Sequence, residues 1–115
     1  MPTPNPSIDP AQALRLSSLV TSTAGGIASR VLAKTPGGNV TLFAFDAGQG
    51  LEEHTSPFDA LVMVLEGALS LTIGGAKVEA APGTIVRMPG GVPHALDAPV
   101  ATRMLLVILR DSGAG

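Results

Sequence analysis

The sequence has no cysteine, no tryptophan and no tyrosine among its 115 residues, and it has only three phenylalanines. Without cysteine, the chain can form no disulfide bond, offer no thiolate to a metal and use no cysteine nucleophile. With so few aromatic rings, any ligand cavity must be lined mainly by aliphatic and methionine side chains, which give a flat ring little to stack on.

Long apolar runs and an excess of charge are also missing. The longest apolar runs, residues 60–65 and 104–109, have six residues each, whereas a membrane-spanning helix needs about twenty. The seven basic residues are scattered and oppose nine acidic ones, so there is no basic cluster of the kind that binds nucleic acid. The N-terminus lacks the basic and apolar regions of a secretory signal. These absences predict a cytoplasmic protein that binds neither membranes nor nucleic acid.

Glycine and proline, by contrast, are abundant. The sequence has fourteen glycines and ten prolines alongside 45% apolar residues, which indicates many short strands joined by tight turns. The pair Gly74 and Gly75 suits a hairpin turn that needs positive φ. Because no helical pattern separates the strand-like runs, we expect an antiparallel sandwich or barrel. Those runs cover residues 27–33, 40–47, 61–65, 68–73, 77–80, 84–88 and 102–110.

The N-terminal part departs from this pattern. Residues 1–10 contain four prolines and are expected to form a loosely attached arm. Apolar residues within 11–19 recur at helical spacing, which predicts a short helix that starts close to Pro10. The expected organisation is therefore an arm and helix over residues 1–25, followed by a barrel over residues 26–115.

The apolar runs 60–65 and 104–109 do not alternate with polar residues. Strands of this kind are covered on both faces. We expect the barrel interior to cover one face, and the N-terminal segment or another subunit to cover the other. A helix over residues 11–19 is too small to cover both runs. We therefore expect a homodimer, formed by packing of sheets or by exchange of the N-terminal segment.

Two glycine-punctuated segments resemble the two conserved motifs of the cupin superfamily. They are GQGLEEHTSPFDALVMVLEG, residues 48–67, and GTIVRMPGGVPHALDA, residues 83–98. The first family motif reads G, five residues, HxH, three or four residues, E, six residues, G. The second reads G, five residues, PxG, two residues, H, three residues, N. The matching positions are Gly48, His54, Gly67, Gly83, Pro89, Gly91 and His94.

This resemblance implies an all-β fold, the antiparallel double-stranded β-helix, or jelly-roll barrel, of small RmlC-like cupins, here with a short N-terminal helix. It also implies a metal site that has lost ligands. Ser56 stands where the family has its second histidine, Ala60 where it has glutamate, and Ala98 where it has asparagine. Of the family's ligand positions, only His54 and His94 remain.

His54 and His94 are the candidate metal ligands. In the family pattern, histidines two apart on a strand point to one face and so into the barrel. Two imidazoles would hold a divalent Mn, Fe, Ni or Zn ion weakly and substoichiometrically. Alternatively, both histidines line the cavity without metal and hydrogen-bond a polar small molecule or transfer a proton. Asp59 is a possible third ligand if Pro57 forces a bulge that turns it inward; otherwise it is solvated or caps a turn.

Further side chains are expected around the histidines. Phe58 and the methionines are commoner as core residues than as ligand contacts. Arg87 must reach solvent or pair with an acid, and if it points inward it could hold a carboxylate substrate. The predicted pocket residues are His54, Ser56, Phe58, Ala60, Met63, Met88 and His94.

The sequence leaves three functions open, because cupins host many unrelated activities. The first is a protein that binds a small organic molecule, with or without a weakly held metal. The second is a metal-dependent oxygenase, isomerase or lyase. The third is a metal-free epimerase or isomerase that uses a histidine base, which would need an orienting carboxylate that no matched family position supplies.

Overall fold

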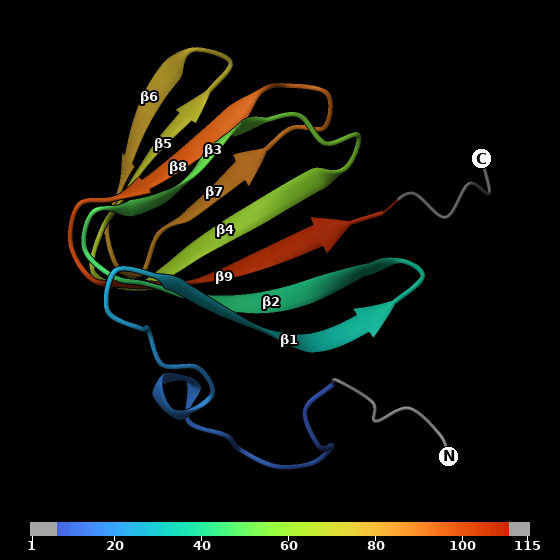
Figure 1. Cartoon of the computed structure of the whole chain (residues 1–115). Helices are drawn as coiled ribbons and strands as arrows, with labels where there is room; N and C mark the ends of the chain where they lie inside the picture. Colours follow the sequence, from blue (N-terminus) through green and yellow to red (C-terminus); the bar gives the residue numbers. More distant parts are fainter. Residues whose placement is uncertain (1–6, 111–115) are drawn as a thin grey trace.

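Two antiparallel sheets packed face to face make up the computed structural model, which describes residues 7–110 (Figure 1). The larger sheet has the strand order β1-β2-β9-β4-β7, and the smaller sheet has the order β3-β8-β5-β6. All recorded strand pairs are antiparallel. The strands are β1 (Ile27–Thr35), β2 (Gly38–Phe45), β3 (Gln49–His54), β4 (Asp59–Glu66), β5 (Leu69–Ile73), β6 (Ala76–Ala80), β7 (Ile85–Met88), β8 (His94–Ala98) and β9 (Thr102–Leu109).

The predicted all-β barrel is confirmed. Each of the seven predicted runs corresponds to one strand. The hairpin between β5 and β6 turns through Gly74 and Gly75, whose φ angles of +57° and +83° are the positive values that a tight turn requires. Two strands, β3 and β8, were not among the predicted runs, and they are the strands that carry the two histidines.

The N-terminal segment is almost entirely non-helical, so the helix predicted over residues 11–19 is reduced to one 3-10 turn, η1 (Leu16–Ser18). Arg15, which precedes the turn, makes no side-chain capping bond. The backbone carbonyls that follow bind arginines of the sheet instead of continuing a helix: Arg103 donates to Val20 O at 3.3 Å. Of the predicted loose arm, residues 1–6 lie outside the described residues. Within the described part of the chain, no helix is long and apolar enough to cross a membrane.

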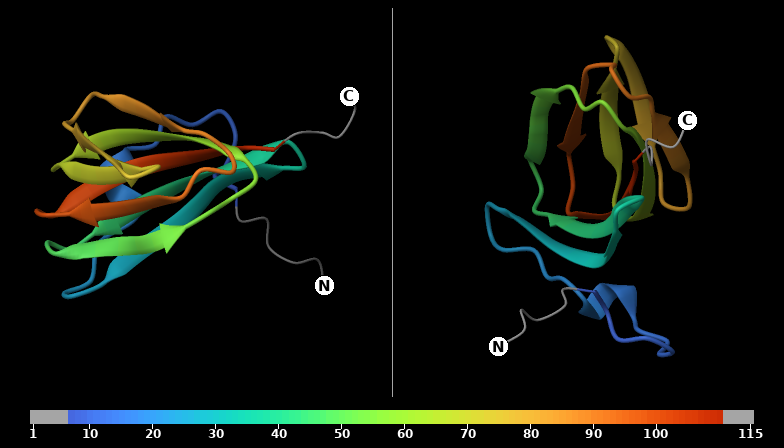
Figure 2. Two further views of the ribbon diagram at one scale, coloured as in Figure 1. Left: turned by 90° about the horizontal axis from the view of Figure 1, so that it is seen from above. Right: turned by 90° about the vertical axis from the view of Figure 1, so that its right-hand side faces the viewer.

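The core lies between the two sheets, and the strands enclose it on most sides (Figure 2). On β4 the side chains alternate, with Ala60, Val62 and Val64 buried and those between them only partly buried. The alternation shows that this apolar run still has distinct inner and outer faces. The buried core consists of Phe45, Ala60, Val62, Val64, Leu69, Leu71, Ala80, Met88, Leu96, Ala98 and Met104.

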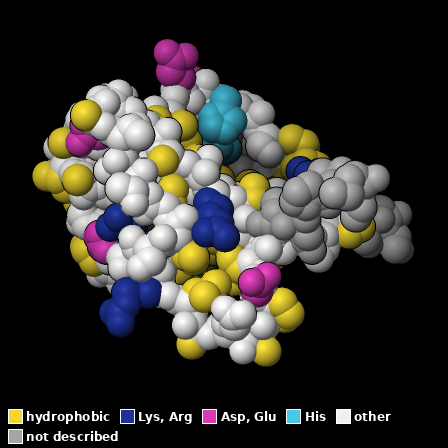
Figure 3. Space-filling view, turned by 60° about the horizontal axis from the view of Figure 1, so that its bottom comes forward, with side chains coloured by type: hydrophobic (Ala, Val, Ile, Leu, Met, Phe, Trp, Pro, Cys, Tyr) yellow, Lys and Arg dark blue, Asp and Glu magenta, His cyan; other side chains and the backbone are white. Residues whose placement is uncertain are grey.

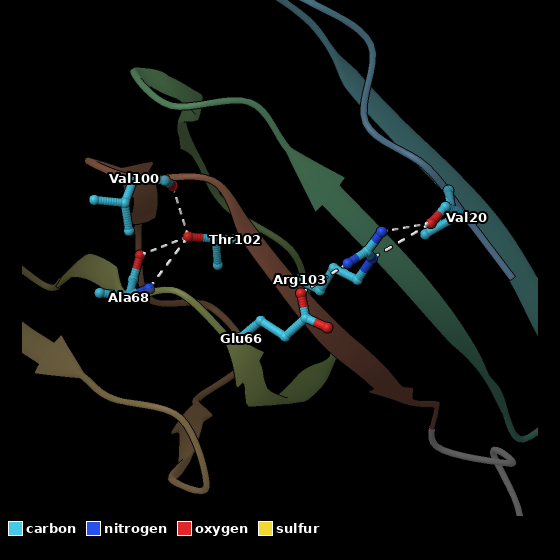
Figure 4. Close-up of polar contacts among 6 residues, drawn as sticks. All are labelled: Val20, Glu66, Ala68, Val100, Thr102 and Arg103. Atoms are coloured by element: carbon cyan, nitrogen blue, oxygen red, sulfur yellow. Dashed lines mark hydrogen bonds and ion pairs between the residues drawn. The ribbon is translucent and has the colours of Figure 1, made fainter. Parts of the chain in front are cut away.

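The N-terminal segment covers part of the outer face of the larger sheet. Leu42 and Ala44 on β2 point away from the core, yet they are 0% and 1% exposed. Arg103 ties the segment down, because its guanidinium binds both Val20 O and the Glu66 carboxylate, the latter at 2.7 Å (Figure 4). The outer faces of β4, β7 and the distal part of β9 have no such cover within the described residues.

Candidate functional site

His54 and His94 meet at the junction of β3 and β8. His54 is the last residue of β3, His94 is the first residue of β8, and the two are register partners. Their ring centroids are 4.4 Å apart and their planes are inclined by 70°. His94 is 4% exposed, whereas His54 is exposed to solvent. The pair therefore connects the barrel interior with the surface, where the histidines lie beside apolar side chains (Figure 3).

A β-bulge in β3 aims His54 inward. Leu51 pairs with Leu96, and the next recorded pair is His54 with His94. Between these pairs β3 advances three residues while β8 advances two, so β3 accommodates one extra residue. Strict alternation from Leu51 would turn Glu53 inward and His54 outward. The extra residue reverses that order and leaves Glu53 exposed.

Backbone carbonyls orient both imidazole rings. His54 Nδ1 lies 3.0 Å from the carbonyl oxygen of Glu52, and His94 Nδ1 lies 3.1 Å from that of Val92. Because a carbonyl oxygen only accepts, each Nδ1 donates, and the Nε2 of a neutral ring is left with a free lone pair. The two Nε2 atoms are 3.2 Å apart. Two lone pairs at this distance repel each other. A proton, a metal ion or a ligand donor between or beside the two Nε2 atoms would relieve that repulsion.

The histidines form the polar end of a partly enclosed cavity of about 150 Å³. Ser56 is the other polar lining residue, and its hydroxyl oxygen accepts a hydrogen bond from Phe58 N at 3.2 Å. The remaining lining is aliphatic or thioether. It consists of Leu51, Ala60, Met88, Leu96, Leu106 and Ile108.

Five of the seven predicted pocket residues line this cavity: His54, Ser56, Ala60, Met88 and His94. The structure does not bring the other two to it. Met63 lies on the outer face of β4, because it is one residue out of step with buried Val62 and Val64. Phe58 lies in a separate surface groove with Arg110, whose guanidinium carbon is 5.1 Å from the ring centroid.

The outward position of Asp59 corrects the hypothesis of a third ligand. Asp59 pairs in register with Leu109 at the regular start of β4, next to inward-facing Ala60, so Pro57 does not induce the bulge that would have turned it inward. Its carboxylate accepts hydrogen bonds from Arg87 Nη2 at 2.7 Å and from the backbone N–H of Gly90 at 2.8 Å. Arg87 is likewise exposed and does not enter the cavity.

These contacts shift the titration of Asp59. The backbone hydrogen bond from Gly90 and, second, the hydrogen bond from Arg87 hold the pKa of this carboxyl below its usual value of 3.8. Asp59 is therefore a permanently charged residue at neutral pH.

Four cavity residues were absent from the sequence-based prediction. Leu51 and Leu96 lie on β3 and β8, the strands that the periodicity did not reveal. Leu106 and Ile108 lie on β9, where every second residue faces inward in step with buried Met104. Alternation counted from Met104 could have identified these last two.

A comparison with known families agrees with the fold and with the two motifs. Residues 41–109, more than half of the chain, match the cupin domain. The chain belongs to the cupin family. No curated protein matches this cupin significantly.

Several solved structures share the architecture. A conserved protein of unknown function from Streptococcus pyogenes, SPY1581, is 36% identical to this cupin over 96% of both chains, with a TM-score of 0.86. A cupin 2 conserved barrel domain protein from Leptotrichia buccalis is 30% identical over 84% of this cupin and 47% of that chain, with a TM-score of 0.80. A cupin superfamily protein from Desulfitobacterium hafniense, 24% identical over 93% of this cupin and 97% of that chain, has a TM-score of 0.84 and shows the fold alone.

The donor set of this cupin fits a metal only in part. Within residues 7–110, no group of three or more His, Cys, Asp or Glu side chains is placed to hold an ion. The two Nε2 atoms are nevertheless 3.2 Å apart, which suits two imidazoles that each lie about 2.1 Å from one ion. The angle between the two nitrogen–metal bonds would then be about 100°, which lies between the octahedral and tetrahedral values. Two oriented imidazoles thus supply half of a usual ligand set, and solvent or ligand atoms would have to supply the rest.

Proposed function

We propose that this cupin binds a small organic molecule with an aliphatic body and one polar or anionic group, and that the polar group lies at the His54–His94 pair. The observation that carries the proposal is the polarity of the cavity. Its polar lining residues are Ser56 and the two histidines, whose Nε2 atoms meet 3.2 Å apart, whereas the rest of the lining is apolar. Ligand sites commonly combine an apolar lining with a few convergent polar groups in this way.

The size of the cavity limits the ligand. Its volume of about 150 Å³ is close to that of an engineered protein cavity that holds benzene, so a body of about six to eight non-hydrogen atoms is expected. The three phenylalanines do not line the cavity. An aromatic ligand therefore finds no ring to stack on, and a compact aliphatic ligand is favoured.

A divalent metal on the same pair is the second candidate, supported by the two Nε2 atoms that face each other 3.2 Å apart. His54 and His94 would hold the ion, with each ring fixed through Nδ1 by a backbone carbonyl. A bound ion would supply a Lewis acid at the polar end of the cavity. With only two protein donors, binding is expected to be weak.

A metal-free reaction with a histidine base has less support. A general base usually needs a partner that stabilises the charge it gains. Here the Nδ1 partners of both rings are backbone carbonyls, which orient the imidazoles but carry no negative charge.

The test is a methyl and imidazole NMR titration of the full chain with pivalate, a seven-heavy-atom carboxylate, and with neopentyl alcohol, its neutral counterpart. We expect pivalate to shift the methyl signals of Met88 and Leu96 saturably. His94→Ala should weaken that binding, whereas Glu53→Ala, which alters an exposed residue next to His54, should not. Shifts confined to residues outside the cavity, or equal binding by His94→Ala, would refute the proposal.

A further inference from the structure

Two loops that lead to the histidines are in direct backbone contact. Residues 55–58 connect β3 to β4 and follow His54, and residues 89–93 connect β7 to β8 and precede His94. The backbone N–H of Gly91 donates to Ser56 O at 2.7 Å. The histidine pair is therefore flanked by a loop–loop contact in addition to the β3–β8 ladder in which the two residues pair.

Gly90 lies at the point of closest approach. A Cβ atom added to it would be 2.5 Å from the carbonyl oxygen of Pro57, a distance that real Cβ atoms do not tolerate. The neighbouring Gly91 is different, since a Cβ there would meet nothing within 4 Å, although its φ of +80° favours glycine.

Asp59 joins both sides of this contact. It begins β4, directly after residues 55–58, and its Oδ1 accepts the N–H of Gly90 at 2.8 Å. Its Oδ2 accepts from Arg87 Nε at 3.0 Å and from Arg87 Nη2 at 2.7 Å. Arg87 belongs to β7, the strand that enters the loop of residues 89–93. One carboxylate thus binds both the strand and the loop that lead to His94.

We propose that Asp59 is a positioning residue for the histidine pair: it holds the loop of residues 89–93 against residues 55–58 and so sets the distance between the two Nε2 atoms. This inference rests on the proposed function of that pair. His54 needs such support because it ends a bulged strand, and within residues 7–110 its ring has one hydrogen bond to the backbone, from Nδ1 to Glu52 O, besides its contact with His94 Nε2.

The role proposed for Asp59 differs from that of an ordinary ion pair. The side chains of Arg87 and Asp59 are 62% and 38% exposed, and ion pairs at this exposure add little to stability. Removal of Asp59 should therefore affect the geometry of the site more than the stability of the barrel.

The chain offers a matched control. Glu66 forms the other recorded carboxylate ion pair, at 2.7 Å to Arg103. It lies at the opposite end of β4 from Asp59, and it does not line the histidine cavity. Glu66→Ala removes a comparable interaction without touching either loop.

The experiment compares Asp59→Ala with Glu66→Ala in the full-length protein. It uses long-range ¹H–¹⁵N spectra of the metal-free imidazoles and a Co²⁺ titration. We expect Asp59→Ala to change the ¹⁵N shifts of both histidines. It should weaken Co²⁺ binding by no more than about tenfold, the lower end of the loss seen when a group bonded directly to a ligand is removed, because Asp59 acts only through the loop that carries Val92. Glu66→Ala should leave both readouts unchanged.

A second pair of variants checks the result if Asp59→Ala does not fold. Gly90→Ala should push the loops apart and change the same imidazole signals, whereas Gly91→Ala should change them less. Imidazole shifts in Asp59→Ala or Gly90→Ala that match those of their controls would overturn the inference. Failure of the wild-type protein to bind Co²⁺ and pivalate would instead refute the proposed function, and the imidazole shifts of the metal-free protein would still test Asp59.

Discussion

The two histidines have different surroundings although they form one pair. His94 is 4% exposed and lies on β8 in the interior of the smaller sheet. His54 is exposed and lies on β3 at the edge of that sheet. Each Nδ1 is bound to a carbonyl two residues earlier in the chain. The same local hydrogen bond thus orients the buried ring of His94 and the exposed ring of His54 toward each other.

Asp59 gives a prediction at the residue scale. Its pKa is lowered below 3.8 by Gly90 and then by Arg87. Its contribution to folding is therefore fully present above about pH 4 and is lost as the pH falls through the lowered value. Asp59→Asn should melt at a lower temperature than wild type at pH 7, and the difference should shrink below about pH 4. Thermal melts across this range provide the measurement. A gap that stays constant down to the acid limit would contradict the prediction.

The bulge in β3 is the decisive feature at the element scale. One extra residue between Leu51 and His54 changes which side chain faces the cavity. The bulge lies at a sheet edge, where the ladder on one side is open and an irregularity interrupts fewer hydrogen bonds.

Deletion and insertion in β3 test this account. Deleting Glu53 restores regular pairing and leaves His54 two positions after Leu51, so His54 should still face His94. Inserting one alanine between Glu53 and His54 keeps the bulge and places the alanine opposite His94, so the imidazole should turn outward. Long-range ¹H–¹⁵N spectra should therefore retain paired histidine signals in the deletion and lose them in the insertion. The opposite pattern would show that the bulge does not set the direction of His54.

Much of the fold could be predicted from the sequence, because the strands with strong apolar runs also have glycine-rich turns beside them. β3 and β8 escaped prediction, and for β3 the reason is physical. The strand β3, with the sequence QGLEEH, has no buried residue and is exposed over its second half, and an edge strand with one solvent-facing side needs few apolar residues. The motif spacing nevertheless located His54 and His94. The outward direction of Asp59 and Met63 followed from the register of β4, which the local sequence does not determine.

At the scale of the whole molecule, the outer face of β4, β7 and β9 is an apolar surface that no other element covers within residues 7–110. Register places its members side by side across three strands. Ile85 and Leu109 are 57% and 47% exposed. The charges at its edges are paired as Arg87 with Asp59 and Arg103 with Glu66. The face comprises Leu61, Met63, Ile85, Leu105, Val107 and Leu109.

We expect this face to form a homodimer with a second copy, because an apolar face whose bordering charges are paired can be self-complementary about a two-fold axis. Val107→Glu should convert the dimer to a monomer. Lys77→Glu, which alters an exposed residue of the smaller sheet, should not. Light scattering at micromolar concentration measures the outcome, and a monomeric wild-type protein would contradict the expectation.

Metal removal gives the last prediction at this scale. We expect any ion bound after purification to be substoichiometric and to be lost on brief chelation, because two imidazoles supply no negative charge. The melting temperature should change little, since the core of eleven buried apolar residues does not depend on the ion. His54→Ala should abolish metal uptake with a similar melting temperature, whereas Glu53→Ala should retain uptake. One tightly held ion per chain in elemental analysis would contradict the two-donor site.

The edge position of β3 also affects how fast the cavity can exchange its contents. β3 pairs with β8 alone, so its detachment breaks one ladder and leaves the larger sheet intact. Such local openings need less free energy than global unfolding. The amide protons of β3 should therefore exchange with solvent faster than those of β4 or β9. The same opening would move His54 away from His94 and give a ligand a route to the interior while the rest of the barrel remains folded.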